Sequence, residues 1–297
     1  MKILITGDKG FVGVETVKLL NKEVNYAKKR IHEVIGYDLM DGFDIEDRDQ
    51  LREFVMQNRP DRILHLAAVA RFADADANPK RAFQTNVIGT ANVASVAKEA
   101  HIPLVYASTG SVYMPINLDP PITEEFPGKG NSVYGCTKFM GEEYVREQNP
   151  YIILRYAHLY GKEKRMHGLI GGFLDRINRG LEPTLYGGKQ SNDFTYITDV
   201  ARANVLALTA PWDKWNQTYN IGTGEELSAQ EAGDIVCEFA GYEGKVEVVP
   251  QREVDPGRFV FDTSKAESML QFKAEYDFKS GLEHMFKEVP NEVRKDN

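Results

Sequence analysis

The stretch KILITGDKGFVG, residues 2–13, decides the fold. It begins with a short apolar run typical of a buried strand and passes directly into a helical pattern that extends to about Lys22. Three glycines lie at the junction: Gly7, Gly10 and Gly13. Glycine is needed where a backbone turns tightly or approaches a pyrophosphate, and the free N–H groups at the start of a helix attract phosphate. Strand, loop and helix together predict a dinucleotide site, with a tight turn that binds no ligand as the alternative.

Short apolar runs alternate with helical patterns throughout the first 110 residues. Further strands are predicted at residues 33–38, 62–68 and 103–108, and helices at 48–58 and 78–100. Strands that alternate with helices at this spacing form a parallel sheet with right-handed crossovers. The sequence therefore predicts an α/β fold with a doubly wound parallel sheet.

The second half of the chain is less regular. A helix over 134–148 and a strand over 151–156 continue the alternation, but beyond residue 160 the short elements are separated by stretches rich in glycine and charge. We expect a dinucleotide-binding domain over residues 1–160 and a smaller C-terminal α/β lobe over residues 161–297 that binds the substrate. The segment near 194–210 is expected to return to the large domain, because its strands are too few for an independent sheet.

Composition narrows the class of protein. The 297 residues are 42% hydrophobic, enough to close a core, and the net charge of −8 argues against a nucleic-acid partner or a polybasic membrane contact. No apolar run approaches the roughly 20 residues that a membrane helix needs. Two cysteines, Cys136 and Cys237, are too few for a disulfide framework or a cysteine zinc site. We therefore predict no metal centre and a location in the reducing cytoplasm.

An acidic residue ends the second predicted strand. Asp38 stands where a carboxylate accepts hydrogen bonds from the adenosine ribose hydroxyls and repels a 2′-phosphate. The sequence therefore favours NAD over NADP, with an ordinary turn aspartate as the alternative. Asp8 is unusual, because a carboxylate within a phosphate loop is unfavourable unless it points outward.

A tyrosine and a lysine share one face at the start of a predicted helix, because Tyr134 and Lys138 are four residues apart. A lysine ammonium beside a phenol favours the phenolate, as does a bound nicotinamide cation, so we expect the tyrosine pKa to fall from about 10 toward working pH. The tyrosine could then act as a general base. Tyr160 and Lys164 repeat the spacing, but in a loop rich in glycine and lysine. Only the first pair follows a hydroxyl residue at a strand end, Thr109, which could hydrogen-bond the same substrate oxygen.

Eight segments follow one another in a recognisable order: MKILITGDKGFVG (1–13), HLAA (65–68), NVIGT (86–90), YASTGSVY (106–113), YGCTK (134–138), DFTYITDVARANVLAL (193–208), YNIGTGE (219–225) and DTSKA (262–266). Together they resemble the extended short-chain dehydrogenase/reductase superfamily and, within it, the NAD-dependent epimerase/dehydratase family. The chain looks most similar to the UDP-glucose 4-epimerases. The resemblance covers nearly the whole chain and implies a Rossmann fold, NAD as the cofactor and a nucleotide-sugar, most simply a UDP-sugar, as the substrate.

Carried onto this sequence, the resemblance implies a role for each matched residue. Tyr134 would be the base, Lys138 its partner and Thr109 the hydroxyl residue of a catalytic triad. The residues expected to contact NAD are Gly7, Gly10, Phe11, Val12, Gly13, Asp38, Asp44, Ile45, Leu66, Ala67, Ala68, Asn86, Tyr134 and Lys138. Those expected to contact the substrate are Thr109, Ser111, His158, Asn192 and Arg258.

Several positions depart from the pattern of the family. His158 stands where these epimerases usually have an asparagine near the diphosphate, Asn192 replaces an arginine, and Met114 replaces a glycine. Arg258 and also Arg252 could supply positive charge to the diphosphate instead. A packed or surface histidine is the alternative at position 158.

The resemblance leaves several functions to compare. A 4-epimerase of the UDP-glucose/UDP-galactose type oxidises C4 to a 4-keto sugar and returns the hydride to the opposite face. A 4,6-dehydratase of this family needs an aspartate and a glutamate directly after the threonine, where Gly110 and Ser111 stand here. A 4-keto-sugar reductase would consume a dissociable reduced cofactor, and a nucleotide sensor would bind without turnover. We predict the 4-epimerase. The resemblance also implies a homodimer, because relatives form their dimer interface from the two long helices, here residues 78–100 and 134–148.

Overall fold

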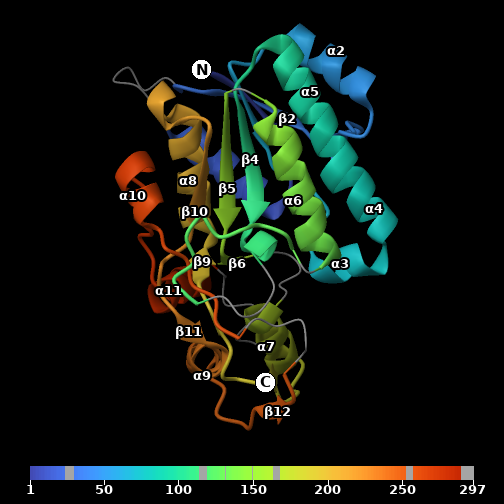
Figure 1. The fold of residues 1–297 in the computed structure, drawn as a ribbon. Helices are drawn as coiled ribbons and strands as arrows, with labels where there is room; N and C mark the ends of the chain where they lie inside the picture. The colour runs from blue at the N-terminus through green and yellow to red at the C-terminus, as the bar shows by residue number, and fades with distance from the viewer. Residues whose placement is uncertain are drawn as a thin grey trace.

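A parallel sheet of six strands is the central element of the fold (Figure 1). The computed structural model describes residues 1–23, 30–113, 119–130, 132–148, 150–162, 168–251 and 257–288. The strands of the sheet are β1 (Lys2–Thr6), β2 (Glu33–Tyr37), β3 (Arg62–His65), β4 (Leu104–Thr109), β5 (Tyr151–Tyr156) and β10 (Gln217–Ile221). Their spatial order is β10-β5-β4-β3-β1-β2 and every neighbouring pair is parallel, which confirms the predicted doubly wound parallel sheet.

Helices cover both faces of the sheet. They are α1 (Phe11–Lys22), α2 (Arg48–Asn58), α5 (Thr90–Ala100), α6 (Val133–Arg146), α8 (Ile197–Thr209) and α10 (Ser264–Leu270). Successive strand residues point to opposite faces, so Ile3 and Ile5 of β1 join the core beneath α1 and α8, whereas Leu4 joins the core beneath α2 and α5. Helix α6 lies alongside α5 on the second face (Figure 1).

The long helix predicted over 78–100 is interrupted in the structure. The short helices α3 (Phe72–Ala77) and α4 (Pro79–Phe83) lead into a π-helical segment, Gln84–Gly89, before α5 begins. Inside this segment the buried Asn86 accepts a hydrogen bond from the Val69 N–H at 2.8 Å and donates one to the Val69 carbonyl at 3.0 Å. Such π-helical turns are common at functional sites. Hydrophobic periodicity cannot show a turn of this kind, because the helix resumes directly after it.

A smaller group of elements lies beyond the carboxyl ends of the sheet strands (Figure 1). Its strands are β6 (His158–Tyr160), β7 (Thr184–Tyr186), β8 (Ser191–Asn192), β9 (Phe194–Tyr196), β11 (Leu227–Ser228) and β12 (Glu247–Val249), and its helices are α7 (Gly168–Asn178), α9 (Ala229–Ala240) and α11 (Phe278–Glu288). The strands pair two by two: β6 with β9, β7 with β12 and β8 with β11. Phe173, Val236 and Leu282 belong to its core, against which Phe11 and Val12 of α1 also pack. The start of α1 therefore lies between the sheet and this second group.

The described part of the chain contains no helix long and apolar enough to cross a membrane.

Candidate active site

The glycine loop after β1 lies where the order of strands in the sheet reverses. Strand β2, which follows β1 along the chain, lies on one side of β1, and β3 lies on the other side. The chain therefore leaves the carboxyl ends of β1 and β3 in opposite directions across the sheet. Open α/β sheets bind ligands in the crevice at such a switch point. Thr6 connects the two loops, because its carbonyl accepts a hydrogen bond from Leu66 N–H at 3.0 Å and its Oγ1 accepts one from Ala67 N–H at 3.3 Å.

Close packing of backbone explains the first and third glycines of the loop. Gly7 has φ of +74°, and a Cβ there would lie 2.7 Å from the backbone nitrogen of Ala67. A Cβ on Gly13 would lie 2.3 Å from the carbonyl oxygen of Gly7. Gly10 caps α1 without a side-chain hydrogen bond, and the first turn contains no acidic residue. The loop thus offers a helix start suited to a phosphate group.

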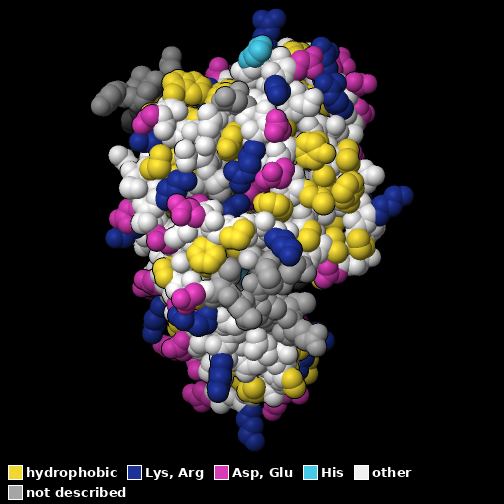
Figure 2. Space-filling model, in the orientation of Figure 1, with side chains coloured by type: hydrophobic (Ala, Val, Ile, Leu, Met, Phe, Trp, Pro, Cys, Tyr) yellow, Lys and Arg dark blue, Asp and Glu magenta, His cyan; other side chains and the backbone are white. Residues whose placement is uncertain are grey.

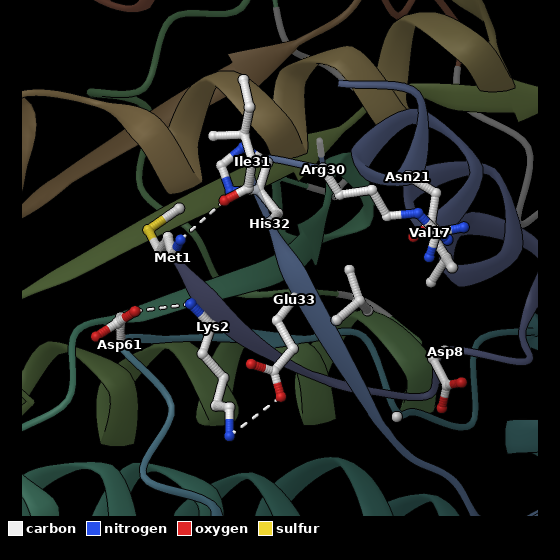
Figure 3. A pocket seen from close by; sticks show the side chains of 12 residues that line it. Met1, Lys2, Asp8, Val17, Asn21, Arg30, Ile31, His32, Glu33 and Asp61 are labelled. Carbon is white, nitrogen blue, oxygen red and sulfur yellow. Dashed lines mark hydrogen bonds and ion pairs between the residues drawn. The ribbon is translucent and has the colours of Figure 1, made fainter. Parts of the chain in front are cut away.

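Asp8 lies to the side of this helix start. Its carboxylate packs against β2, where a Cβ on Gly36 would lie 2.3 Å from Oδ2. Asp8 lines a groove of about 790 Å³ between α1 and β2, together with Val17 and His32. Figure 3 shows these side chains around the groove. Burial, together with the nearby Asp38 carboxylate, raises the pKa of Asp8. None of Thr109, Tyr134 and Lys138 lines this groove.

The carboxylate of Asp38 is held at the carboxyl end of β2. It accepts hydrogen bonds from Met40 N–H at 2.9 Å and from Lys9 N–H, in the glycine loop, at 3.2 Å. This places the acid beside the loop, as ribose recognition requires. Asp44 forms part of the next turn, whereas the side chain of Ile45 is in the core and packs against Gly89. Ile45 therefore has a packing role in addition to the predicted contact with NAD.

Asn86 joins the loop after β3 to α6, on the far side of the expected cofactor crevice. One donor of its amide binds the Val69 carbonyl, just after Ala68, and the other binds Thr137 Oγ1 of α6 at 3.1 Å. Both amide donors are thus used within the protein. The residue fixes the loop that follows β3 against the helix carrying Tyr134, which gives it a positioning role.

The structure brings the three predicted catalytic side chains onto two adjacent elements. Thr109 ends β4, and Tyr134 and Lys138 lie in the first turns of α6. The Thr109 hydroxyl is close enough to the Tyr134 phenol to lower its pKa, and it donates a hydrogen bond to Ser111 Oγ at 3.2 Å. Ser132 begins α6 by accepting a hydrogen bond from Gly135 N–H at 3.0 Å, which fixes where the tyrosine emerges.

The predicted lowering of the tyrosine pKa is wrong for the protein alone. Burial raises the pKa of Tyr134 to about 12, and the hydrogen bond from Thr109 only partly opposes it. Burial likewise lowers the pKa of Lys138 to about 7, against the influence of Glu142. The reason is that desolvation disfavours the charged form of both groups. A bound nicotinamide cation is the further positive charge that would favour the phenolate.

An aromatic wall faces the residue after Thr109. A Cβ on Gly110 would lie 2.3 Å from Cζ of Phe259 and 2.9 Å from Cζ of Phe261. Both phenylalanines are buried, in a cluster with Val112 and other apolar side chains. Sequence reasoning missed this wall, because nothing in the sequence indicates that residues so far apart along the chain meet.

Of the predicted substrate residues, Thr109 and Ser111 lie at and just after the end of β4, whereas His158 and Asn192 lie in the second group of elements. His158 begins β6 with its ring against Phe194, and Asn192 lies in β8. Arg258 makes a bidentate ion pair with Glu226, with Nε and Nη2 at 2.7 and 2.6 Å from the carboxylate oxygens. Hydrogen bonds from Arg258 and Ser191 lower the pKa of Glu226 to about 2. The charge of Arg258 is therefore balanced here by a residue that the sequence did not single out.

Three residues singled out in the sequence, Met114, Lys164 and Arg252, lie outside the described residues. Within the described ranges no group of three or more His, Cys, Asp or Glu side chains could hold a metal ion.

Comparison with known proteins defines the class. Residues 3–222 match the model of the NAD dependent epimerase/dehydratase family. The chain is 34% identical to a Methanocaldococcus jannaschii protein named "Putative UDP-glucose 4-epimerase", over 98% of this chain and 99% of that one. The chain therefore belongs to the NAD-dependent epimerase/dehydratase family, and its cofactor is NAD.

Two solved structures have the same fold over almost the whole chain. The UDP-glucose 4-epimerase of Thermotoga maritima with UDP-glucose is 27% identical, with a TM-score of 0.86 over 97% of this chain and 98% of that one. The UDP-glucose 4-epimerase of Thermus thermophilus with NAD is 26% identical, with a TM-score of 0.82 over 97% of this chain and 100% of that one.

Proposed function

We propose that the protein is an NAD-dependent nucleotide-sugar 4-epimerase that interconverts UDP-glucose and UDP-galactose. The observation that carries the proposal is the placement of Thr109, at the end of β4, beside Tyr134 at the start of α6, with Lys138 one helical turn further along that helix. A hydroxyl, a phenol and a lysine at the carboxyl end of β4 can position a sugar hydroxyl and remove its proton. The similarity to the M. jannaschii and T. maritima proteins supports a UDP-sugar as the substrate.

Each side chain has one task in the proposed reaction. NAD, held by the glycine loop and Asp38, would supply the acceptor for the hydride of the sugar C4 and the source for its return. Tyr134 takes the proton of the C4 hydroxyl as C4 becomes a ketone, and gives it back when the hydroxyl is restored. Thr109 holds the same oxygen through its hydroxyl, and the ammonium of Lys138 favours the phenolate. The 4-keto sugar must rotate within the pocket between the loss and the return of the hydride, so that its opposite face meets the cofactor. The substrate pocket must therefore be large enough for this rotation.

The aromatic wall weighs against the dehydratase alternative. Elimination of water across C5 and C6 needs an acid and a base next to the threonine. Gly110 has no side chain, and the space that one would occupy is filled by Phe259 and Phe261. Ser111 is buried and donates no acidic proton at neutral pH. We therefore place the dehydratase second. A reductase that uses NADPH is disfavoured by Asp38 beside the glycine loop.

We also propose a cytoplasmic homodimer. Exposed apolar side chains gather on α4, the π-helical segment and α6: Phe83, Ile88, Met140 and Tyr144. Figure 2 shows hydrophobic side chains gathered over this region, on the right of the view. An exposed apolar surface of this kind is typical of a protein–protein interface. We propose a second copy of this chain as the partner, because relatives pair these helices in their dimers. Both cysteines are free thiols, the state in which a reducing compartment keeps cysteines. Sedimentation that shows only monomer at micromolar concentration would contradict the dimer.

The test of the proposed function compares two tyrosines on α6. Tyr134→Phe removes the phenol that takes the proton, and we expect kcat for UDP-glucose epimerisation to fall by about 10²–10⁴-fold. Tyr144→Phe is the matched control, because this tyrosine lies on the same helix outside the triad and the substitution keeps the ring that it contributes to the proposed dimer surface. Turnover of Tyr134→Phe within about tenfold of wild type would rule out the proposed base. NAD binding by the wild type without turnover of any nucleotide-sugar would favour a sensor.

A further inference from the structure

A carboxylate lies fully buried behind the proposed catalytic residues. Glu142 is 0% exposed and stands four residues after Lys138 on α6, so the two side chains share a face of the helix. Its Oε1 accepts hydrogen bonds from Ser108 Oγ at 2.5 Å and from Arg155 Nε at 2.9 Å. Its Oε2 accepts from Arg155 Nη2 at 2.6 Å and from Arg146 Nη2 at 2.9 Å. A carboxylate with four such donors has one fixed position.

The donors come from the elements that carry the triad. Ser108 precedes Thr109 on β4, and Arg155 lies on β5, the next strand of the sheet. Glu142 itself belongs to the helix of Tyr134 and Lys138. The carboxylate thus fixes α6 to both strands, one residue along β4 from Thr109 and on the helix that carries Tyr134.

The same carboxylate is the negative charge beside a buried lysine. Lys138 is 3% exposed, and its Nζ lies 4.1 Å from the centre of the Tyr106 ring on β4. Burial lowers the pKa of Lys138 to about 7, and Glu142 opposes this. On the other side His65 of β3 is buried, and burial together with Lys138 keeps its pKa well below the ordinary value. His65 therefore stays neutral, and Glu142 is the acid that acts on the lysine. The other titratable or charged neighbours of this network are Arg146, Arg155, Tyr106, Tyr113 and Tyr134.

We infer that Glu142 is a positioning residue of the proposed epimerase reaction: it fixes α6 against β4 and β5 and supplies the negative charge that keeps Lys138 protonated. The inference rests on the proposed function, because the protonated lysine matters there for the phenolate of Tyr134 and for holding NAD. It also explains why Arg155 is buried, since this guanidinium balances the carboxylate without exposing it to water.

The test is the pH dependence of kcat. In Glu142→Gln the lysine loses the negative charge that opposes the effect of burial, so it releases its proton at lower pH. We therefore expect the alkaline loss of activity to move down by about one pH unit. Glu142→Asp keeps the charge and should restore the wild-type pH profile with a lower kcat. Ser108→Ala removes one hydrogen bond to the carboxylate but no charge, so it should lower kcat without moving the profile.

A purely structural role gives a different result. If kcat falls in Glu142→Gln while the alkaline limb stays where it is in wild type, the inference is wrong. If Glu142→Gln does not fold because Arg155 is left unpaired, the double variant Glu142→Gln/Arg155→Gln removes both buried charges, and the same criterion applies to it.

A second readout separates this inference from the proposed function. NAD affinity of the wild type and of the variants, measured by calorimetry across the same pH range, should fall at high pH and should do so earlier in the variant without the carboxylate. A wild type that binds NAD but converts no UDP-sugar contradicts the proposed function only. An unchanged pH dependence of NAD affinity contradicts the role of Glu142.

Discussion

The variant Gly13→Ala tests whether close backbone packing forms the NAD site. A Cβ at this position would lie 2.3 Å from the Gly7 carbonyl oxygen and 2.7 Å from backbone atoms of Asp8, closer than real Cβ atoms come. The obstacles are backbone atoms, so the alanine can be accommodated only if the loop moves away from the start of α1. Gly7 cannot follow freely, because it is itself packed against the backbone of Ala67.

The magnitude follows from the cost of overpacking, typically about 1–3 kcal/mol. The strained loop is the expected phosphate site, so a loop that opens to admit the methyl group loses NAD contacts. Since about 1.4 kcal/mol is a factor of ten in an equilibrium constant, we expect NAD to bind roughly 5- to 150-fold more weakly. The strain that is not relieved in this way should appear as a lower melting temperature.

Calorimetric titration of cofactor-free protein with NAD measures the first effect and thermal unfolding the second. Gly172→Ala is the matched control: it lies in α7, has no positive φ, and a Cβ there would meet nothing within 4 Å. It should leave NAD affinity unchanged and add up to about 1 kcal/mol of stability through helix propensity. Wild-type NAD affinity and melting temperature in Gly13→Ala would refute the reasoning.

Three further predictions concern the site and its surroundings. Gly110→Asp forces a carboxylate against Phe259 and Phe261, so chemical denaturation should show a loss of about 3 kcal/mol or more and no gain of dehydratase activity; unchanged stability would mean that the wall yields. Lys138→Met should abolish epimerisation yet raise the free energy of unfolding at pH 7 by on the order of 3 kcal/mol, because the lysine pKa is about 7 when folded and 10.5 otherwise. The free-energy cost of burying the lysine charge is complete below pH 7 and disappears as pH rises toward 10.5. The stability that Lys138→Met gains over wild type should therefore shrink by about pH 10, and a gain that is the same at all pH values would contradict the lowered pKa of Lys138. Glu226 has a pKa of about 2 when folded and 4.5 otherwise, so its ion pair stabilises the protein above pH 4.5 and this contribution is lost as pH falls toward 2. Glu226→Gln should therefore differ from wild type in unfolding at about pH 6 and converge with it near pH 2, whereas a difference that persists in acid would contradict the pairing.

The sequence predicted the arrangement of the sheet because local and global signals agree there. The helix Arg48–Asn58 and the strands around the glycine loop lie where periodicity places them. The long helix predicted over 78–100 was wrong in one respect, since the π-helical segment around Asn86 depends on bonds to Val69 and Thr137, far away in the sequence. Tertiary hydrogen bonds of this kind leave no periodic signal.

Some features of the candidate site could likewise be predicted from the sequence, and others could not. Thr109 and Tyr134 could be paired from the sequence, because a strand end and a helix start meet predictably in this topology. The pKa of Tyr134 could not be predicted from the sequence, because it depends on how completely the site is desolvated. Nor could the pairing of Arg258 with Glu226, since both residues lie in loops whose approach is set by the packing of the second group of elements.

The central claim is that this chain epimerises a nucleotide-sugar with an NAD that it retains. The most direct measurement is proton NMR of the purified protein, without added cofactor, incubated in turn with UDP-glucose, UDP-GlcNAc and their GDP and dTDP counterparts. We predict that the anomeric signal of the 4-epimer, UDP-galactose, grows from UDP-glucose until equilibrium is reached. The methyl signal of a 4-keto-6-deoxy sugar, or no new signal from any of these substrates, would contradict the assignment.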